Sequence, residues 1–156
     1  MDAAGLSILL KEMEADVRVV EDASSKAGER IREETPGHLE ACAYELARLY
    51  SAFERSLERI CEEFENHFEK RGDYHEKLLQ RLALQLDGIR PALLPCDWVD
   101  RLRELKGFRH LVRHAYDIRL RRDRLSELVG IAQQLARVLP GWCAHFGAKV
   151  REEQGW

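Results

Sequence analysis

Apolar residues recur along most of the chain at steps of three and four positions, which is the spacing of amphipathic helices. The most regular stripe runs from Leu39 to Phe68, with Glu, Arg and Lys on the opposite face. We expect a long helix here that begins at Thr35-Pro36, an N-cap residue followed by proline at the first helical position. Arg71-Gly72-Asp73 predicts its end.

Weaker stripes predict the other helices. The first runs from about Leu6 to the region of Gly28, and Asp73 is expected to cap a third helix with apolar residues through Leu86 inward. Two prolines make 88–96 a loop. The later helices are expected over a short segment capped by Asp97 and broken by Gly107, over 108–118, and over 121–146 with a kink or restart at Pro140-Gly141.

No alternating run is long enough for a strand, and 10 Gly and 4 Pro are too few for a many-stranded sandwich or barrel. The 156 residues, 45% hydrophobic and 34% charged, predict one globular domain over 1–156. We therefore expect an all-α, up-and-down helical bundle of about four main helices plus short helices.

Several patterns bear on location and chemistry. No apolar run approaches the ~18 residues of a membrane span, and the N-terminus lacks the basic region of a signal peptide. These features predict a cytoplasmic protein without membrane contact. The four widely spaced cysteines are then expected to be reduced core thiols. No cluster has the spacing of metal ligands, so we expect no metal and no cofactor; His67 and His75 are interpreted as surface residues.

Positive charge is concentrated in residues 101–124, where nine basic residues stand against three acidic ones. The segment carries +6, so the remainder of a chain with net charge −3 carries −9. Eight of the nine are arginines, whose planar fork binds phosphate in a bidentate way. Two interpretations stay open: a surface stripe paired with acidic helices of the same bundle, or a site for nucleic acid or a nucleotide.

Titratable residues crowd the centre of this segment, 107–117. At roughly 100° per residue, His110, His114 and Asp117 share one helical face, while Arg109, Arg113 and Tyr116 share another. Satisfied buried histidines and surface arginines would explain the pattern without any chemistry. A site for moving protons beside a phosphate would explain it equally well.

The spacing Arg109-x4-His114-x-Tyr116 resembles the R-x4-6-H signature of HEPN domains, in the R-x4-H-x-Y form of HepT-like toxins. The resemblance extends to 43–50, to 89–91 and into the last helix. It implies a metal-independent endoribonuclease that acts as a homodimer. It also implies a toxin–antitoxin pair, in which a minimal nucleotidyltransferase of the MNT type opposes the toxin by AMPylating Tyr116. Without the resemblance, Tyr116 is equally a core or interface tyrosine.

The residue types suit RNA cleavage. Histidine transfers protons near neutral pH, so His114 is the expected acid/base, and Arg109 is the expected cation on the scissile phosphate. His110 is an expected accessory residue, and Asp117 either orients His114 or forms a plain helix ion pair. The expected RNA-binding residues are Arg113, Arg119, Arg121 and Arg122.

Arg109 and His114 are about 140° apart on a regular helix, so they do not point the same way. Either the arginine wraps round, or the helix is irregular near Gly107, or the site straddles a two-fold axis; we favour the last two together. A non-catalytic HEPN-type module that binds RNA or nucleotide, or a helical partner-binding adaptor, are the alternatives.

Overall fold

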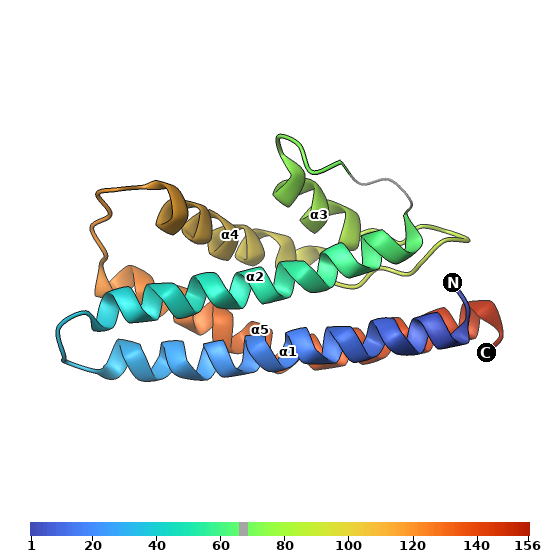
Figure 1. Cartoon of the computed structure of the whole chain (residues 1–156), viewed down its shortest axis with the longest axis horizontal. Coiled ribbons are helices and arrows are strands. Elements are labelled where there is room, and N and C mark those ends of the chain that lie inside the picture. The colour runs from blue at the N-terminus through green and yellow to red at the C-terminus, as the bar shows by residue number, and fades with distance from the viewer. Residues whose placement is uncertain (66–68) are drawn as a thin grey trace.

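The computed structural model describes residues 1–65 and 69–156 and shows an all-α bundle (Figure 1). Its elements are α1 (Ala3–Arg32), α2 (His38–Phe64), α3 (Tyr74–Leu82), the 3-10 turn η1 (Cys96–Trp98), α4 (Val99–His114) and α5 (Arg122–Gln154). The described residues contain no strand, only an isolated bridge between Leu86 and Arg90. The predicted fold class is confirmed.

Helix α2 is the centre of this bundle. It packs against α1, α3, α4 and α5, and α1 also packs against α5. Helices α2 and α5 run in the same direction and α1 runs in the opposite one, and both termini lie at the same end of the molecule (Figure 1). Buried residues of α1, α2 and α5, such as Met13, Phe53 and Leu135, join in one continuous core. Helices α3 and α4 lie over the side of α2 that faces away from α1 (Figure 1).

The start of α2 differs from the prediction. The Thr35 carbonyl accepts a hydrogen bond from the His38 amide at 3.3 Å, so Thr35-Pro36 form a turn between helices. Gly37 follows with φ 83°, a left-handed conformation that L side chains rarely adopt and that no α-helix contains. The helix therefore begins at His38. It ends at Phe64, before the predicted stop at Arg71-Gly72-Asp73, and the last residue of the predicted stripe, Phe68, lies outside the described residues.

The predicted break at Gly107 is wrong. Helix α4 follows η1 directly and continues through Gly107 to His114. A glycine inside a helix costs only about 1 kcal/mol relative to alanine, and the buried Leu105 and Phe108 on either side offset that cost. The helix then ends four residues before Ile118. No residue of 115–121 is buried, so a longer helix would have no core to cover.

Helix α5 is longer than predicted and continues through Pro140-Gly141. Proline removes one helical hydrogen bond, but Leu139 and Phe146 on either side are fully buried and hold the helix against the core. The expected cap of α3 is confirmed, since Asp73 is its N-cap residue, although its side chain makes no capping hydrogen bond.

The loop between α3 and η1 is fixed by a buried arginine. Arg90 is completely buried, and its Nε donates to Glu65 Oε1 at 2.9 Å just beyond the end of α2. Its Nη1 donates to the Leu84 carbonyl oxygen at 3.0 Å. These bonds hold the loop against α2, and so determine where α4 begins. None of the helices over residues 1–65 and 69–156 combines the length and the apolar character that crossing a bilayer requires.

All four cysteines are free thiols, but only three are packed against the core. Burial raises the pKa of Cys42 to about 11 and the pKa values of Cys61 and Cys143 to about 12. Cys96 is exposed at the start of η1, so the prediction of a core thiol is wrong for this residue.

We expect a maleimide at neutral pH to label the folded protein once, at Cys96, because the thiolate is the reactive form, Cys42 and Cys61 are buried, and Cys143 is partly buried with a raised pKa. Mass spectrometry should count one adduct in buffer and four in denaturant. The Cys96→Ser variant should give none when folded. Rapid labelling of two or more thiols in the native protein would contradict the packing of α2 and α5.

Candidate active site

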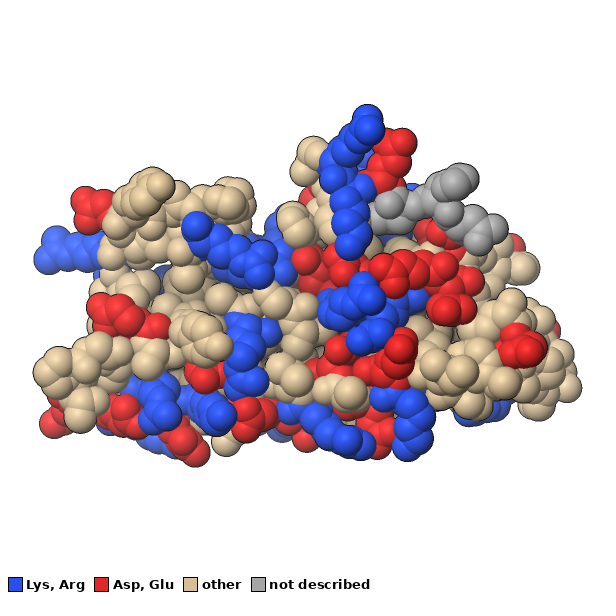
Figure 2. Space-filling model, in the orientation of Figure 1, with Lys and Arg blue, Asp and Glu red and all other residues tan. Residues whose placement is uncertain are grey.

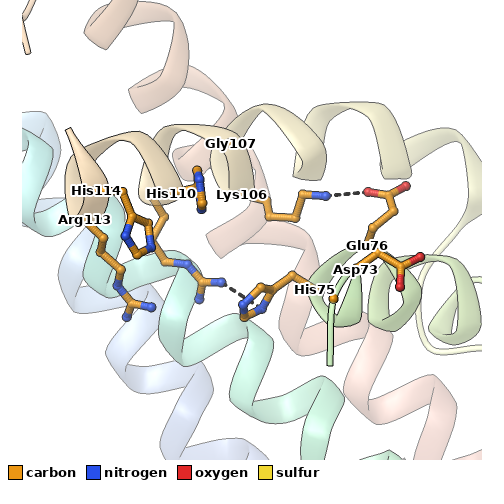
Figure 3. Close-up of a pocket in the computed structure, with 10 residues that line it drawn as sticks. Asp73, His75, Glu76, Lys106, Gly107, His110, Arg113 and His114 are labelled. Carbon is orange, nitrogen blue, oxygen red and sulfur yellow. Dashed lines mark hydrogen bonds and ion pairs between the residues drawn. The ribbon is translucent and has the colours of Figure 1, made fainter. Parts of the chain in front are cut away.

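A hollow opens between the start of α3 and the second half of α4 (Figure 3). Its walls carry mainly charged and titratable side chains: Asp73, His75, Glu76, Lys106, Arg109, His110, Arg113 and His114, with Gly72 and Gly107. Gly107 leaves the wall open there, since an added Cβ would meet nothing within 4 Å. Both residues of the R-x4-H spacing line this one hollow.

Arg109 is almost completely buried, with 4% of its surface exposed. Its Nη2 forms an ion pair with Glu54 Oε1 on α2 at 2.9 Å, and its guanidinium lies over the ring of Tyr50, 4.6 Å from the centroid. Nη1 also lies 3.4 Å from Ser51 Oγ. Arg109 therefore ties α4 to α2 and presents only an edge to the hollow.

His110 and His114 share a face of α4 as predicted, with ring centroids 4.5 Å apart. Both are exposed. Arg113 lies on the other predicted face with Arg109, and its Nη2 donates to the same Ser51 hydroxyl at 3.0 Å. Arg113 is exposed and has no carboxylate partner within the described residues.

The predicted divergence of Arg109 and His114 is resolved within one chain. Helix α4 is continuous at Gly107, so the expected irregularity there is wrong. The long arginine side chain instead follows the surface of α2, and its end lies against α3, where it borders the hollow that His114 also lines.

Asp117 and Tyr116 do not lie on the helical faces predicted for them. Helix α4 ends at His114, and Ala115 is extended, with φ −98° and ψ 124°. Neither residue lines the hollow with His114, and Asp117 forms no hydrogen bond with any described residue. Tyr116 is fully exposed, which excludes the interpretation as a core tyrosine.

Sequence reasoning missed two residues of the site. His75 is a surface histidine as predicted, but its Nδ1 also lies 2.8 Å from Glu54 Oε2 and it lines the hollow, which the sequence did not indicate. Glu54 was counted with the solvated face of α2, yet it is 5% exposed. The signal was weak: Glu54 is four residues from Tyr50 on a stripe that is otherwise apolar. His67, the other histidine of that interpretation, lies outside the described residues.

Glu76 of α3 also lines the hollow and joins α3 to α4. This carboxylate accepts hydrogen bonds from Arg103 and Lys106 of α4 (Figure 3 shows the Lys106 contact), and these bonds lower its pKa to about 2. Two of the nine basic residues in 101–124 thus share one carboxylate as their ion-pair partner. Within the part of the chain that is described, no three His, Cys, Asp or Glu side chains are grouped so as to hold a metal ion.

Arg101 lies over the ring of Trp98, and the four other remaining arginines divide into two groups. Arg121 pairs with Asp123, and Arg124 pairs with Glu104 and Glu127. Arg119 forms no ion pair with any described residue, and Arg122 bonds only to the backbone carbonyl of Glu33, at 3.0 Å. On the face shown in Figure 2, basic and acidic side chains likewise lie interleaved along α1 and α2. Pairing with acidic residues of the same bundle therefore accounts for Arg121 and Arg124, while a phosphate-binding role for Arg119 and Arg122 stays a prediction.

Two of the three tryptophans contribute to packing. Trp98 and Trp142 form an edge-to-face pair with centroids 5.2 Å apart, which joins η1 to α5. Trp156 is 44% exposed and lies outside the core.

An all-helical bundle whose fourth helix carries an arginine and a histidine into one hollow is the arrangement expected of a HEPN-type domain. Comparison with protein families gives the assignment: residues 41–150 match the family described as HepT-like protein. The match covers more than half of the chain and includes the whole hollow, so the protein belongs to the HepT-like family. Membership indicates, at a coarse level, a HEPN-type ribonuclease toxin. No curated protein and no solved structure matches the chain.

We expect Arg109→Ala to lower the free energy of unfolding by about 3–5 kcal/mol, because it leaves the buried Glu54 carboxylate without its cation. Urea denaturation should measure the loss. The control is Arg113→Ala, which removes an exposed arginine four residues away and should change stability by less than about 0.5 kcal/mol. Equal stability of both variants would show that the Arg109–Glu54 pair does not hold α4 to α2.

Proposed function

We propose that this protein is a metal-independent endoribonuclease toxin that acts in the cytoplasm and whose site is the hollow between α3 and α4. The observation that carries the proposal is that Arg109 and His114, the two residues of the family's spacing, line one hollow. The exposed Arg113 beside them offers an unpaired cation for a phosphate. RNA is the substrate class that the family indicates.

The chemistry requires a proton carrier and a cation. His114 moves a proton at the hollow, and Arg109 faces the scissile phosphate with Arg113 next to it. The 2′-hydroxyl of the RNA attacks its own phosphate, which yields a 2′,3′-cyclic phosphate and a 5′-hydroxyl. His110 lies against His114 and acts as an accessory residue.

Affinity for RNA comes from the arginines without carboxylate partners. Arg113, Arg119 and Arg122 keep their charge available, whereas Arg121 shares its charge with Asp123 in an exposed ion pair that phosphate can displace. These contacts neutralise backbone phosphates irrespective of sequence, so binding should weaken as salt rises.

The burial of Arg109 is compatible with both alternatives to the ribonuclease function. An arginine paired with Glu54 and covered by Tyr50 stabilises the fold whether or not the chain cleaves RNA. The same geometry would serve a non-catalytic HEPN-type module or a helical adaptor. Loss of activity in Arg109→Ala therefore cannot distinguish the functions, and the decisive variant is one at the exposed His114.

We expect His114→Ala to cleave RNA about 10² to 10⁴ times more slowly than the unchanged protein and to lose toxicity to growing cells, because proton transfer is lost. Cleavage should be measured with EDTA present, alongside RNA binding and thermal unfolding. The fold and much of the RNA affinity should persist, because His114 is exposed and the arginines remain. Unchanged cleavage by the variant, or cleavage by the unchanged protein that EDTA abolishes and magnesium restores, would contradict the mechanism.

Homodimerisation is part of the proposal. Leu111 is 47% exposed on α4 beside the site, and Tyr116 is fully exposed just after the helix. A second copy that covers both would bring the two 107–117 segments to one cleft.

We expect light scattering to give twice the mass of one chain, and we expect the Leu111→Glu variant to give the mass of a single chain. A monomer with full ribonuclease activity would refute the shared cleft.

The antitoxin partner is proposed to be an MNT-type nucleotidyltransferase that AMPylates Tyr116. Full exposure on an extended segment makes the Tyr116 hydroxyl accessible to another enzyme. The added nucleotide would bring negative charge next to the site and repel RNA phosphates.

We expect Tyr116→Phe to cleave RNA as the unchanged protein does but to escape the co-expressed antitoxin, because only the modifiable hydroxyl is lost. Growth and the mass of the purified toxin should be followed together, with Tyr44→Phe as the control at another exposed tyrosine. Full neutralisation of Tyr116→Phe would exclude this modification as the mechanism.

A further inference from the structure

The hollow holds a histidine that the R-x4-H spacing does not include. His75 lies in the first turn of α3 and faces α4 across the hollow (Figure 3). Its Nδ1 is 2.8 Å from Glu54 Oε2, and about half of its side chain is exposed. The ring thus has one nitrogen against α2 and part of its surface open to the hollow.

Glu54 decides which nitrogen carries the proton. Its Oε1 accepts from Arg109 Nη2 at 2.9 Å, and its Oε2 faces the imidazole. A carboxylate oxygen can only accept, so Nδ1 of His75 must donate to it. The neutral ring then has its lone pair on Nε2, which forms no hydrogen bond with any described residue. The 3.2 Å contact between Nδ1 and Arg109 Nη2 is then a close approach of two donors, not a second hydrogen bond.

A carboxylate hydrogen-bonded to one imidazole nitrogen stabilises the cation that forms when the other nitrogen takes a proton. Among the described residues, His114 has no such carboxylate. The two histidines therefore differ in how they are positioned: Glu54 fixes the ring of His75 and leaves its Nε2 free to accept a proton.

We propose that His75 is the general base of the cleavage reaction, taking the 2′-hydroxyl proton at Nε2, with Glu54 as its positioning residue and His114 as the general acid. The proposal rests on the ribonuclease function proposed above. The O2′–P bond forms as the P–O5′ bond breaks. The 2′-hydroxyl proton passes to His75, and a proton from His114 passes to the departing 5′-oxygen. Solvent then resets both rings, and no other reactant is consumed.

The assignment makes the proton chemistry complete in one chain. His75 and His114 line the same hollow of one molecule. A dimer would then bring together two sites, each with its own base and acid, rather than one site that neither chain could form alone.

The test compares His75→Asn with His114→Ala on two substrates. Asparagine can replace the Nδ1–H donor to Glu54, but it has no atom in the place of Nε2. The first substrate is ordinary RNA, and the second carries sulfur in place of the leaving 5′-oxygen, since a thiolate departs without a proton. The matched control is His145→Asn, at an exposed histidine of α5 outside the hollow.

On ordinary RNA we expect both variants to lose about 10² to 10⁴ in cleavage rate, and the control to lose nothing. Sulfur should restore His114→Ala to within about tenfold of the unchanged protein and leave His75→Asn as slow as before, because it replaces the acid and not the base. Equal melting temperatures would show that all variants fold; if His75→Asn melts early, His75→Gln takes its place.

Three outcomes would overturn the assignment. One is ordinary RNA cleavage by His75→Asn within twofold of the unchanged protein, with His114→Ala inactive. Another is rescue of His75→Asn by sulfur. The third is recovery of activity when His75→Asn and His114→Ala chains are mixed, since that would place base and acid on different chains. Each of these outcomes rejects His75 as the base but leaves the proposed ribonuclease function intact. The ribonuclease function itself is rejected if the unchanged protein cleaves neither substrate.

Discussion

The carboxylate of Glu54 is the interaction on which the candidate site depends. It lies buried on α2 and bonds to Arg109 of α4 through one oxygen and to His75 of α3 through the other. Without it, α3 and α4 would keep their direct polar contacts through Glu76 but would lose the carboxylate that ties both of them to α2. A buried charge is tolerated when it is paired and hydrogen-bonded, and here the pairing also fixes where the walls of the hollow stand.

The helices follow from the sequence because each buries one apolar stripe, and such stripes are visible without a structure. The sequence did not reveal where helices continue or begin when tertiary contacts decide it. Gly107 looks like a helix breaker, yet the buried residues around it hold α4 straight through. Gly37 is the reverse case: a positive φ, which only the turn geometry reveals, delays the start of α2 past Thr35-Pro36.

The site was predictable to the extent that it is local in sequence. His110 and His114 are one turn apart and lie on the same face of α4, as their spacing predicts. His75 and Glu54 join from two other helices, and no spacing rule connects them with α4. The prediction placed Tyr116 and Asp117 on helical faces because it extended the helix to Ile118. Helix α4 ends at His114, so neither residue lies on a helical face. The basic segment likewise contains both paired and unpaired arginines, a distinction that charge counting cannot make.

Tyr116 has a further consequence through its backbone. It follows an extended residue in a segment, 115–121, that has no buried side chain. Apart from Leu120, which is partly buried against the core, the segment contributes little to the core, so its local free energy is only weakly coupled to that of the bundle. A bulky group attached there would leave the folding equilibrium of the bundle almost unchanged. Such a modification would act on function alone and would not mark the protein for unfolding or turnover, so its removal could return the same folded molecule to its earlier state.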